Sequence, residues 1–461
     1  MRELSITVFL CVIYICSFAQ NVPNDSFGDD SIMIRRIADE ILLHSKAYQN
    51  LHDLTKNIGQ RLSASPGFYK AEQWGLKLLQ NSGADKAWLQ ECMIPHWVRG
   101  GKDQAIVNIS SKKKELDVLA LGNSLGTGTN GVSANVIEVA SFEDLEKKKD
   151  SIKGKIVFYN YKFNSTFINV FQAYGDAVRY RGAGASQAAK YGASAVIVRS
   201  MTASTDNNPH TGALRYDTTF PQIPAVAIGL KDADWLDSVL RQKKATVSLK
   251  TNGHFLADTI GHNVIGELPG TEFPGEYITV GGHLDSWDPG EGAQDDGAGV
   301  VHTIEVLRAY KAMGYQPKHT IRFVLFANEE NGLRGGAKYA EEAKTKNEKH
   351  IFAIESDAGG FSPRGYTFGG TPEQLQKLQG WIPLLISYGV YQIVGAGGGA
   401  DISPLNANLK TPVAELAPDT QRYFDYHHAR NDVFENVNKR ELELGAVNLA
   451  ALIYLVDKYG L

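Results

Sequence analysis

Residues 281–299 read GGHLDSWDPGEGAQDDGAG, and the interpretation of the whole chain depends on this stretch. A histidine and an aspartate, His283 and Asp285, follow directly on a short apolar run that predicts a strand. Two adjacent aspartates, Asp295 and Asp296, then lie in a glycine-rich turn before a helical pattern. Imidazole and carboxylate groups together are ligands that zinc accepts, although Asp and Gly are also ordinary turn residues. The stretch therefore predicts part of a metal site and requires further ligands downstream.

Further acidic candidates follow two more predicted strands. Glu329 and Glu330 come after the apolar run 320–326, and Asp357 comes after 352–354. Each has an ordinary alternative, because acids at a helix start favour the helix dipole and an aspartate before glycines is a common turn residue. In open α/β sheets, however, sites form at the carboxyl ends of strands. Their joint occurrence in this order favours a metal-dependent catalytic site.

Two adjacent histidines, His427 and His428, complete the set of candidates, with a surface or core pair as the alternative. The order of histidine, paired aspartates, paired glutamates, aspartate and histidine resembles the M28 family of dinuclear zinc exopeptidases. The phrases GGHLDSWD, AQDDGAG, NEENG and ESDAGG carry this resemblance, which extends over nearly all of the chain after its N-terminal segment. The joint motif set is highly specific for the family.

The resemblance implies a ligand set for two zinc ions. Asp295 would bridge the two ions. His283 and Asp357 would complete one site, and Glu330 and His428 the other. The peptide bond that follows Asp295 would be cis, as in relatives.

The resemblance also implies roles for residues beside the metals. Glu329 would be the general base, and Asp285 would orient His283 from behind. Of the two adjacent histidines, His428 is the expected ligand, because the family pattern places an aspartate four residues on and Asp432 fits it. The expected activity is hydrolysis of dipeptides or short peptides that have a free N-terminus.

Alternating strand and helix patterns predict an α/β fold in which helices flank a mostly parallel central sheet. Short β-like runs between about 116 and 255 contain no cluster of chemical residues and predict an inserted domain. This insert resembles a protease-associated (PA) domain. The expected segments are a signal peptide at 1–19, the N-terminal part of the catalytic domain at 20–115, the insert at 116–255 and the C-terminal part at 256–461, which carries the metal site.

Composition narrows the class of protein. The chain has 461 residues, of which 43% are hydrophobic and 21% are charged, with a formal net charge of −4. These values are those of a globular protein and exclude intrinsic disorder. The mild acidity gives no support to nucleic-acid binding. No run after the N-terminal segment is long and apolar enough to span a membrane, so we expect no membrane partner.

The N-terminal segment predicts export. Arg2 precedes an apolar run, residues 4–15, and small residues at Ser17 and Ala19 fit a cleavage site. A membrane anchor is the alternative, but the run is shorter than the ~20 residues that span a bilayer. A secreted or periplasmic protein is therefore expected. Cys92 would be the one cysteine left after cleavage, and a buried thiol is its ordinary interpretation.

Several alternatives stay open at this level. A broader aminopeptidase differs from a dipeptidase only in the details of its pocket. A non-catalytic receptor of the same fold would lack ligands, and a single-zinc glutaminyl cyclase would lack the paired glutamates. Tyr423 and Tyr426 are candidates to stabilise an oxyanion, and the glycine-rich run 395–399 could shape the pocket. His210 could reach the site from the insert, although a structural role is the ordinary interpretation. A homodimer is implied by the resemblance alone.

Overall fold

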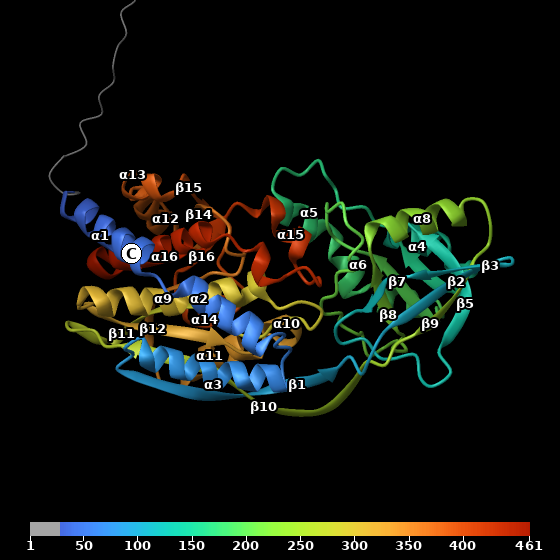
Figure 1. The fold of residues 1–461 in the computed structure, drawn as a ribbon, viewed down its shortest axis with the longest axis horizontal. Helices are drawn as coiled ribbons and strands as arrows, with labels where there is room; N and C mark the ends of the chain where they lie inside the picture. The colour runs from blue at the N-terminus through green and yellow to red at the C-terminus, as the bar shows by residue number, and fades with distance from the viewer. Residues whose placement is uncertain (1–27) are drawn as a thin grey trace, which may run out of the picture.

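Two eight-stranded sheets organise residues 28–461, the part of the chain that the computed structural model describes. The predicted signal peptide at 1–19 lies outside these residues. The first sheet has the strand order β1-β10-β12-β11-β13-β16-β14-β15, and the second has β3-β2-β9-β5-β6-β7-β8-β4. The two sheets lie at opposite ends of an elongated molecule, with α5, α6 and α15 between them (Figure 1).

The first sheet is mixed, which corrects the expectation of a mostly parallel sheet. Its central strands β12, β11, β13 and β16 run parallel, but β1 and β10, β10 and β12, and β14 and β16 pair antiparallel. Helical crossovers enforce parallel pairing only where they join neighbouring strands. The strands are β1 (Lys86–Val98), β10 (His254–Leu268), β11 (Phe273–His283), β12 (His319–Phe326), β13 (Lys349–Glu355), β14 (Pro363–Gly369), β15 (Gln392–Gly395) and β16 (Val413–Pro418).

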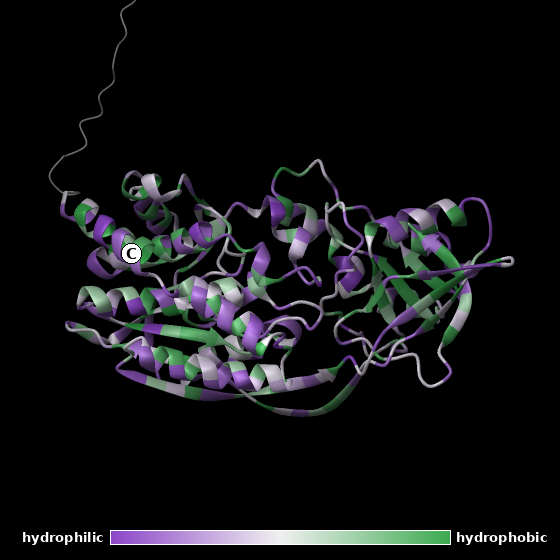
Figure 2. Cartoon of the chain, in the orientation of Figure 1, coloured by the Kyte–Doolittle hydropathy of each residue, from purple (hydrophilic) through white to green (hydrophobic). Residues whose placement is uncertain are grey.

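Helices cover both faces of this sheet and bury its apolar residues. The helix α9 follows the glycine-rich turn, and twelve of its sixteen residues are buried. The final helix α16 packs against α9 and α1, and its long apolar face joins the main core (Figure 2). The α-helices of this part are α1 (Gly28–His44), α2 (Ala47–His52), α3 (Pro66–Asn81), α9 (Ala298–Met313), α10 (Glu329–Gly332), α11 (Arg334–Thr345), α12 (Pro372–Gln379), α13 (Ile382–Leu385), α14 (Ser403–Leu409), α15 (Tyr423–Tyr426) and α16 (Lys439–Tyr459). The shorter turns are η1 (Asp53–Ile58), η3 (Ala293–Gly297), η4 (Ile386–Tyr388), η5 (Thr420–Arg422) and η6 (Phe434–Asn436).

The second sheet has its own core. The strands β6, β7 and β8 are buried along their whole length, because α7 covers one face and α8 the other. Strands buried on both faces read as continuous apolar runs, which is how the sequence shows them. The strands are β2 (Gln104–Ile109), β3 (Lys112–Leu116), β4 (Val118–Ala120), β5 (Val132–Val139), β6 (Ile156–Tyr159), β7 (Ala195–Arg199), β8 (Ala225–Ile228) and β9 (Thr246–Lys250). The helices are α4 (Phe142–Lys147), η2 (Lys149–Ser151), α5 (Val170–Ala177), α6 (Arg179–Gly182), α7 (Gly184–Ala189) and α8 (Leu230–Leu240).

The chain passes between the two sheets through β1 and β10. These strands pair antiparallel from Lys86 opposite Glu267 to Val98 opposite His254. The strands β2 and β3 follow β1 and pair in the second sheet, so this sheet begins at Gln104. The chain therefore leaves the first sheet at the end of β1 and returns to it at the start of β10, and these two segments lie side by side (Figure 1).

The structure also bears on the expected role of Cys92 and on the expected lack of a membrane-spanning segment. Cys92 is 4% exposed, and burial raises the pKa of its thiol to about 12, as expected of a packing residue. Within residues 28–461, no helix combines the length and apolarity that a bilayer crossing requires.

Candidate metal centre

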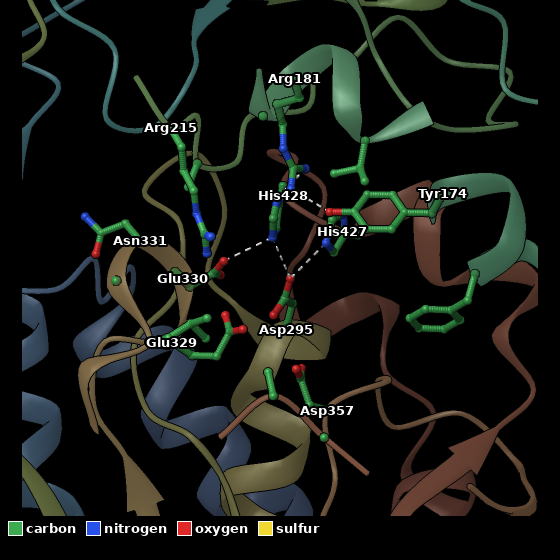
Figure 3. A pocket seen from close by; sticks show the side chains of 18 of the residues that line it. Tyr174, Arg181, Arg215, Asp295, Glu329, Glu330, Asn331, Asp357, His427 and His428 are labelled. Atoms are coloured by element: carbon green, nitrogen blue, oxygen red, sulfur yellow. Dashed lines mark hydrogen bonds and ion pairs between the residues drawn. The ribbon is translucent and has the colours of Figure 1, made fainter. Parts of the chain in front are cut away.

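The predicted site residues meet at the carboxyl ends of neighbouring strands of the first sheet. Figure 3 shows five of them: Asp295, Glu329, Glu330, Asp357 and His428. His283 is the last residue of β11, and Asp357 lies two residues after β13. Glu329 and Glu330 begin α10, directly after the turn that follows β12. Since β12, β11 and β13 are parallel neighbours, their carboxyl ends bring these side chains to one edge of the sheet.

Asp295 lies at the middle of the group, and each of its carboxylate oxygens faces a different histidine. Oδ1 is 3.1 Å from His283 Nε2, and Oδ2 is 3.2 Å from His428 Nε2. Asp357 Oδ1 lies 3.3 Å from the first imidazole nitrogen, and Glu330 Oε2 lies 3.0 Å from the second. The structure thus gathers all five predicted ligands into two sets that share one carboxylate.

The turn that carries Asp295 is held by Asp432. The carboxylate of Asp432 accepts hydrogen bonds from the backbone N–H groups of Ala293 at 3.1 Å, Gln294 at 2.7 Å and Asp295 at 3.1 Å. The peptide bond between Asp295 and Asp296 is cis, as predicted. The carboxylate of Asp296 accepts hydrogen bonds from two backbone N–H groups, at 2.9 and 3.0 Å. The two adjacent aspartates therefore have different surroundings.

Asp285 connects His283 to the start of α10. His283 Nδ1 lies 2.9 Å from the backbone carbonyl oxygen of Asp285, whereas the nearest carboxylate oxygen is 3.9 Å away. The carboxylate accepts hydrogen bonds from Ser63 Oγ at 2.8 Å and from the backbone N–H groups of Glu329 at 3.0 Å and Glu330 at 3.3 Å. Asp285 thus meets the His283 ring through its backbone carbonyl and not through its carboxylate, which was the group expected there. The carboxylate instead holds the start of the helix that bears the two glutamates.

The centre holds more negative charge than its own residues balance. Burial raises the pKa of both Glu329 and Glu330 well above the usual value. Burial lowers the pKa of His283, but the neighbouring carboxylates of Asp357 and Asp295 outweigh it and raise that pKa well above its usual value. An additional positive charge at this place would therefore be stabilised.

Four ligand atoms of the centre fit a metal ion. His283 Nε2, Asp295 Oδ2, Glu330 Oε1 and Asp357 Oδ1 are buried and have no hydrogen-bond partner. Buried polar atoms are nearly always paired, so such a convergent set requires a partner of another kind. Imidazole nitrogens and carboxylate oxygens are zinc ligands, and three or more of them lie within 4.8 Å of one another here. The residues present therefore fit zinc.

The two adjacent histidines differ in their surroundings. The rings are stacked with centroids 3.5 Å apart. His427 Nε2 lies 3.7 Å from Asp295 Oδ2, farther than His428 Nε2, which also reaches Glu330. These distances favour His428 as the ligand. His210 lines a small cavity together with His427, both of its ring nitrogens are buried and unpartnered, and burial lowers its pKa to about 4.

The second sheet supplies a support for His428 that the sequence did not predict. His428 Nδ1 lies 3.2 Å from the carbonyl oxygen of Thr211, and the N–H of Thr211 donates to the carbonyl of His428 at 3.0 Å. Arg181 lies beside the same ring and donates a hydrogen bond of 2.5 Å to the hydroxyl of Tyr174. The contact joins residues 217 positions apart, so no local motif could have indicated it.

A cavity of about 980 Å³ opens over the centre, between the two sheets. Its floor is acidic and comes from the first-sheet part, with Asp295, Glu329, Glu330, Asp357 and Glu415. Of the two tyrosines proposed from sequence, Tyr423 lines the cavity and Tyr426 does not. The end of the predicted glycine-rich run also lines it. Its other wall comes from the second-sheet part and includes Tyr174, Arg181 and Arg215 (Figure 3).

Comparisons with known proteins agree with this geometry. The model of peptidase family M28 matches residues 263–453. Carboxypeptidase Q of Xenopus laevis is 35% identical over 423 residues, which are 90% of this chain and 88% of the relative. A peptidase M28 precursor from Shewanella amazonensis has a similar structure, with a TM-score of 0.88, 33% identity, and coverage of 93% of this chain and 97% of that one. BSAP, a zinc aminopeptidase from Bacillus subtilis, shares the fold with a TM-score of 0.64 at 20% identity, over 89% of this chain and 94% of that one. The family shown by these relatives is the one that the sequence motifs indicated: this chain belongs to peptidase family M28 and is a metallopeptidase.

Proposed function

We propose that this enzyme is a dinuclear zinc exopeptidase that removes the first residue of dipeptides or short peptides with a free N-terminus. The observation that carries the proposal is the position of Asp295, whose two oxygens lie 3.1 and 3.2 Å from two different imidazoles. A carboxylate placed in this way suits a bridge between two cations. Membership of the M28 family supports a peptidase, and the similarity to a zinc aminopeptidase fold supports zinc.

Each zinc ion would have its own residues in addition to the shared Asp295. His283 and Asp357 would hold one ion, and Glu330 and His428 the other. When bound, two zinc ions supply Lewis acidity that polarises a peptide carbonyl and acidifies water at neutral pH. The hydrogen bonds of Asp432 and Asp285 keep the ligands in place, so little rearrangement is needed.

Glu329 is the proposed general base. Its carboxylate lines the cavity and points into it, whereas its backbone N–H is held by Asp285 (Figure 3). Among residues 28–461, no side-chain hydrogen bond engages this carboxylate, so it is available to a water molecule. The carboxylate would take a proton from that water and pass it to the leaving amine.

The acidic floor supports recognition of a free N-terminus. Asp357 and Glu415 line the cavity beside Glu329, and among the described residues the basic side chains of the first-sheet part that line it are His427, His428 and Arg334. Burial raises the pKa of Glu415 to about 8. An α-ammonium group would offset this crowded negative charge, and a blocked N-terminus would not. A broader aminopeptidase is the alternative, and it would accept long peptides as readily as short ones.

The inserted domain and the N-terminal segment also belong to the proposal. We place the inserted PA-like domain at about 116–255 and note that β2 and β3, just before it, pair in the same sheet. The N-terminal segment 1–19 is proposed as a signal peptide of a secreted or periplasmic enzyme. Comparison of the N-terminus of the exported protein with Gln20 would test this.

The variant Glu329→Gln tests the proposed function. Glu329→Gln should retain two zinc ions per chain and lose roughly 100- to 10,000-fold in kcat on dipeptides, because only proton transfer is removed. Metal content and rates should be measured on the same preparation. Glu341→Gln, which neutralises an exposed acid on α11, is the matched control and should behave as wild type. Normal turnover by Glu329→Gln would refute the general base, and one zinc ion per chain would refute the dinuclear centre.

A further inference from the structure

The wall of the cavity opposite the acidic floor carries positive charge. Three arginines of the second-sheet part line it, Arg179, Arg181 and Arg215, and Arg334 of α11, from the first-sheet part, also lines the cavity. The cavity is therefore divided between a negative floor and a positive wall. A molecule with one charge of each sign at its two ends is the ligand that such a division fits.

Arg215 differs from Arg179 and Arg181 because its side chain has no partner. Arg181 is occupied by the hydroxyl of Tyr174 at 2.5 Å, and Arg179 by the hydroxyl of Tyr180 at 3.0 Å. Within residues 28–461, no ion pair or side-chain hydrogen bond engages Arg215. Its guanidinium points into the cavity above Glu330 (Figure 3). Arg334 likewise has no side-chain partner within the described residues, but Arg215 is the free arginine on the wall opposite the acidic floor.

The backbone of Arg215 is fixed relative to the metal centre. Its N–H donates to the carbonyl of Gly182 at 2.9 Å. The preceding Leu214 is 1% exposed and donates to the carbonyl of Gly122 at 2.9 Å. Four residues earlier, Thr211 of the same loop exchanges two hydrogen bonds with His428. The loop therefore fixes the backbone from which the free Arg215 side chain extends relative to a proposed zinc ligand.

We propose that Arg215 binds the C-terminal carboxylate of the substrate and thereby selects dipeptides. This inference rests on the proposed exopeptidase function. In a dipeptide the carboxylate follows the scissile bond by one residue, about 3.5 Å of extended chain, so its partner must lie next to the metal centre. Guanidinium binds carboxylate through two parallel hydrogen bonds, which gives both affinity and orientation. A longer peptide places its carboxylate elsewhere and leaves Arg215 unpaired beneath a neutral peptide group.

The test compares a dipeptide with its own C-terminal amide, alanyl-leucine and alanyl-leucine amide, using the zinc-loaded enzyme. The wild type should cleave the acid about 10- to 100-fold more efficiently than the amide, the range expected of a charge-assisted hydrogen-bond pair. Arg215→Ala should raise KM for the acid by a similar factor and leave KM for the amide unchanged. Arg215→Lys should restore part of the preference, because it keeps the charge without the fork. Arg36→Ala, on the exposed face of α1, is the control for loss of one positive charge.

Each outcome decides between specific alternatives. Equal cleavage of acid and amide by the wild type, or an equal loss on both substrates in Arg215→Ala, would overturn the carboxylate-binding role and leave the exopeptidase intact. If Arg334→Ala, and not Arg215→Ala, raised KM for the acid alone, the carboxylate would be bound by Arg334 and the role proposed for Arg215 would be overturned. Absence of zinc-dependent cleavage of either substrate by the wild type would instead refute the proposed function.

Discussion

Two clusters of charge lie on or beside the central strands of the first sheet, and they differ in how their charges are balanced. In the Arg322 cluster, which consists of Arg322, Glu267, Glu348 and His350, the guanidinium donates to Glu267 at 2.8 Å and to both oxygens of Glu348 at 2.6 and 3.0 Å. The same guanidinium lies 3.9 Å from the ring centroid of Tyr277. Each charge of this cluster therefore finds its partner within the chain.

The metal centre, at the carboxyl ends of these strands, is built in the opposite way. Its carboxylates outnumber its imidazoles, and buried ligand atoms are left without hydrogen-bond partners. A buried carboxylate that is paired with a cationic side chain needs no further partner. A group of buried carboxylates with too few cationic side chains is stabilised by a bound cation. In this molecule, burial of charge marks a functional site where the charges do not satisfy one another.

The largest expected effect comes from removal of the shared carboxylate. Asp295→Asn keeps the shape of the side chain but removes its charge, so the two proposed zinc ions would lose their common ligand. We expect zinc content to fall well below two per chain and activity to fall by about 1,000-fold or more. Metal analysis and initial rates measure this. Glu348→Gln removes a carboxylate from the Arg322 cluster and should change neither the zinc content nor the activity. A loss of either in this variant would mean that the two clusters are not functionally distinct.

The next effect is on stability. Arg322→Met leaves Glu267 and Glu348 buried without their cation, and loss of one partner of a buried ion pair costs about 3–5 kcal/mol. The free energy of unfolding in urea should fall by this amount, with little change in kcat of the protein that remains folded. A loss below about 1 kcal/mol would contradict the view that this cluster is internally balanced.

A smaller effect is expected from the residue that holds the glycine-rich turn. Asp432→Asn weakens the hydrogen bonds to three successive N–H groups beside the bridge, and changes of this kind lower metal affinity by about 10- to 100-fold. Competition with a chelator measures the affinity. Asp258→Asn, at an exposed position of β10, is the matched control. Unchanged affinity would mean that the turn keeps its shape without Asp432.

The smallest effect is a dependence of stability on pH. Burial acts against ionisation, but hydrogen bonds from His350 and Arg322 outweigh it and lower the pKa of Glu348 to about 2, from 4.5. Its folded pKa lies below the unfolded value, so its contribution is complete above pH 4.5 and is lost as pH falls toward 2. Wild type should exceed Glu348→Gln in unfolding free energy by about 1–2 kcal/mol near neutral pH. The difference should shrink as acid is added; a constant difference would refute this assignment.

Much of the centre was predictable from sequence because its ligands follow strands. His283, Glu330 and Asp357 each stand just after an apolar run, where the edge of a sheet gathers them. The order of strands was less predictable. The strand β16 is short and contains Glu415 facing the cavity, so its apolar pattern is interrupted, and it was not expected although it lies beside β13. Apolar periodicity also carries no information on strand direction, so the antiparallel pairs of the first sheet could not be predicted from it.

Supporting residues from distant segments could not be predicted. Arg61 is fully buried and donates to the carbonyls of Leu284 at 2.7 Å and Gly292 at 2.9 Å, across more than two hundred positions. Nothing in its own neighbourhood distinguishes it from a surface arginine. The same holds for Arg215 and Thr211, whose positions depend on the docking of the second sheet against the first. Local patterns indicate ligands, whereas the groups that position them depend on tertiary structure.

The pairing of β1 with β10 has a consequence for how this enzyme could be varied. Val98 and His254 face each other at the end of the ladder, so a short turn between them would rejoin the first sheet. Such a shortened chain would keep all five proposed zinc ligands. It would lose Thr211 behind His428 and the whole arginine-bearing wall. The proposed metal ligands and the proposed partner of the substrate carboxylate thus belong to separate segments of the chain, and exchanging the second segment tests whether it changes which peptides are cleaved.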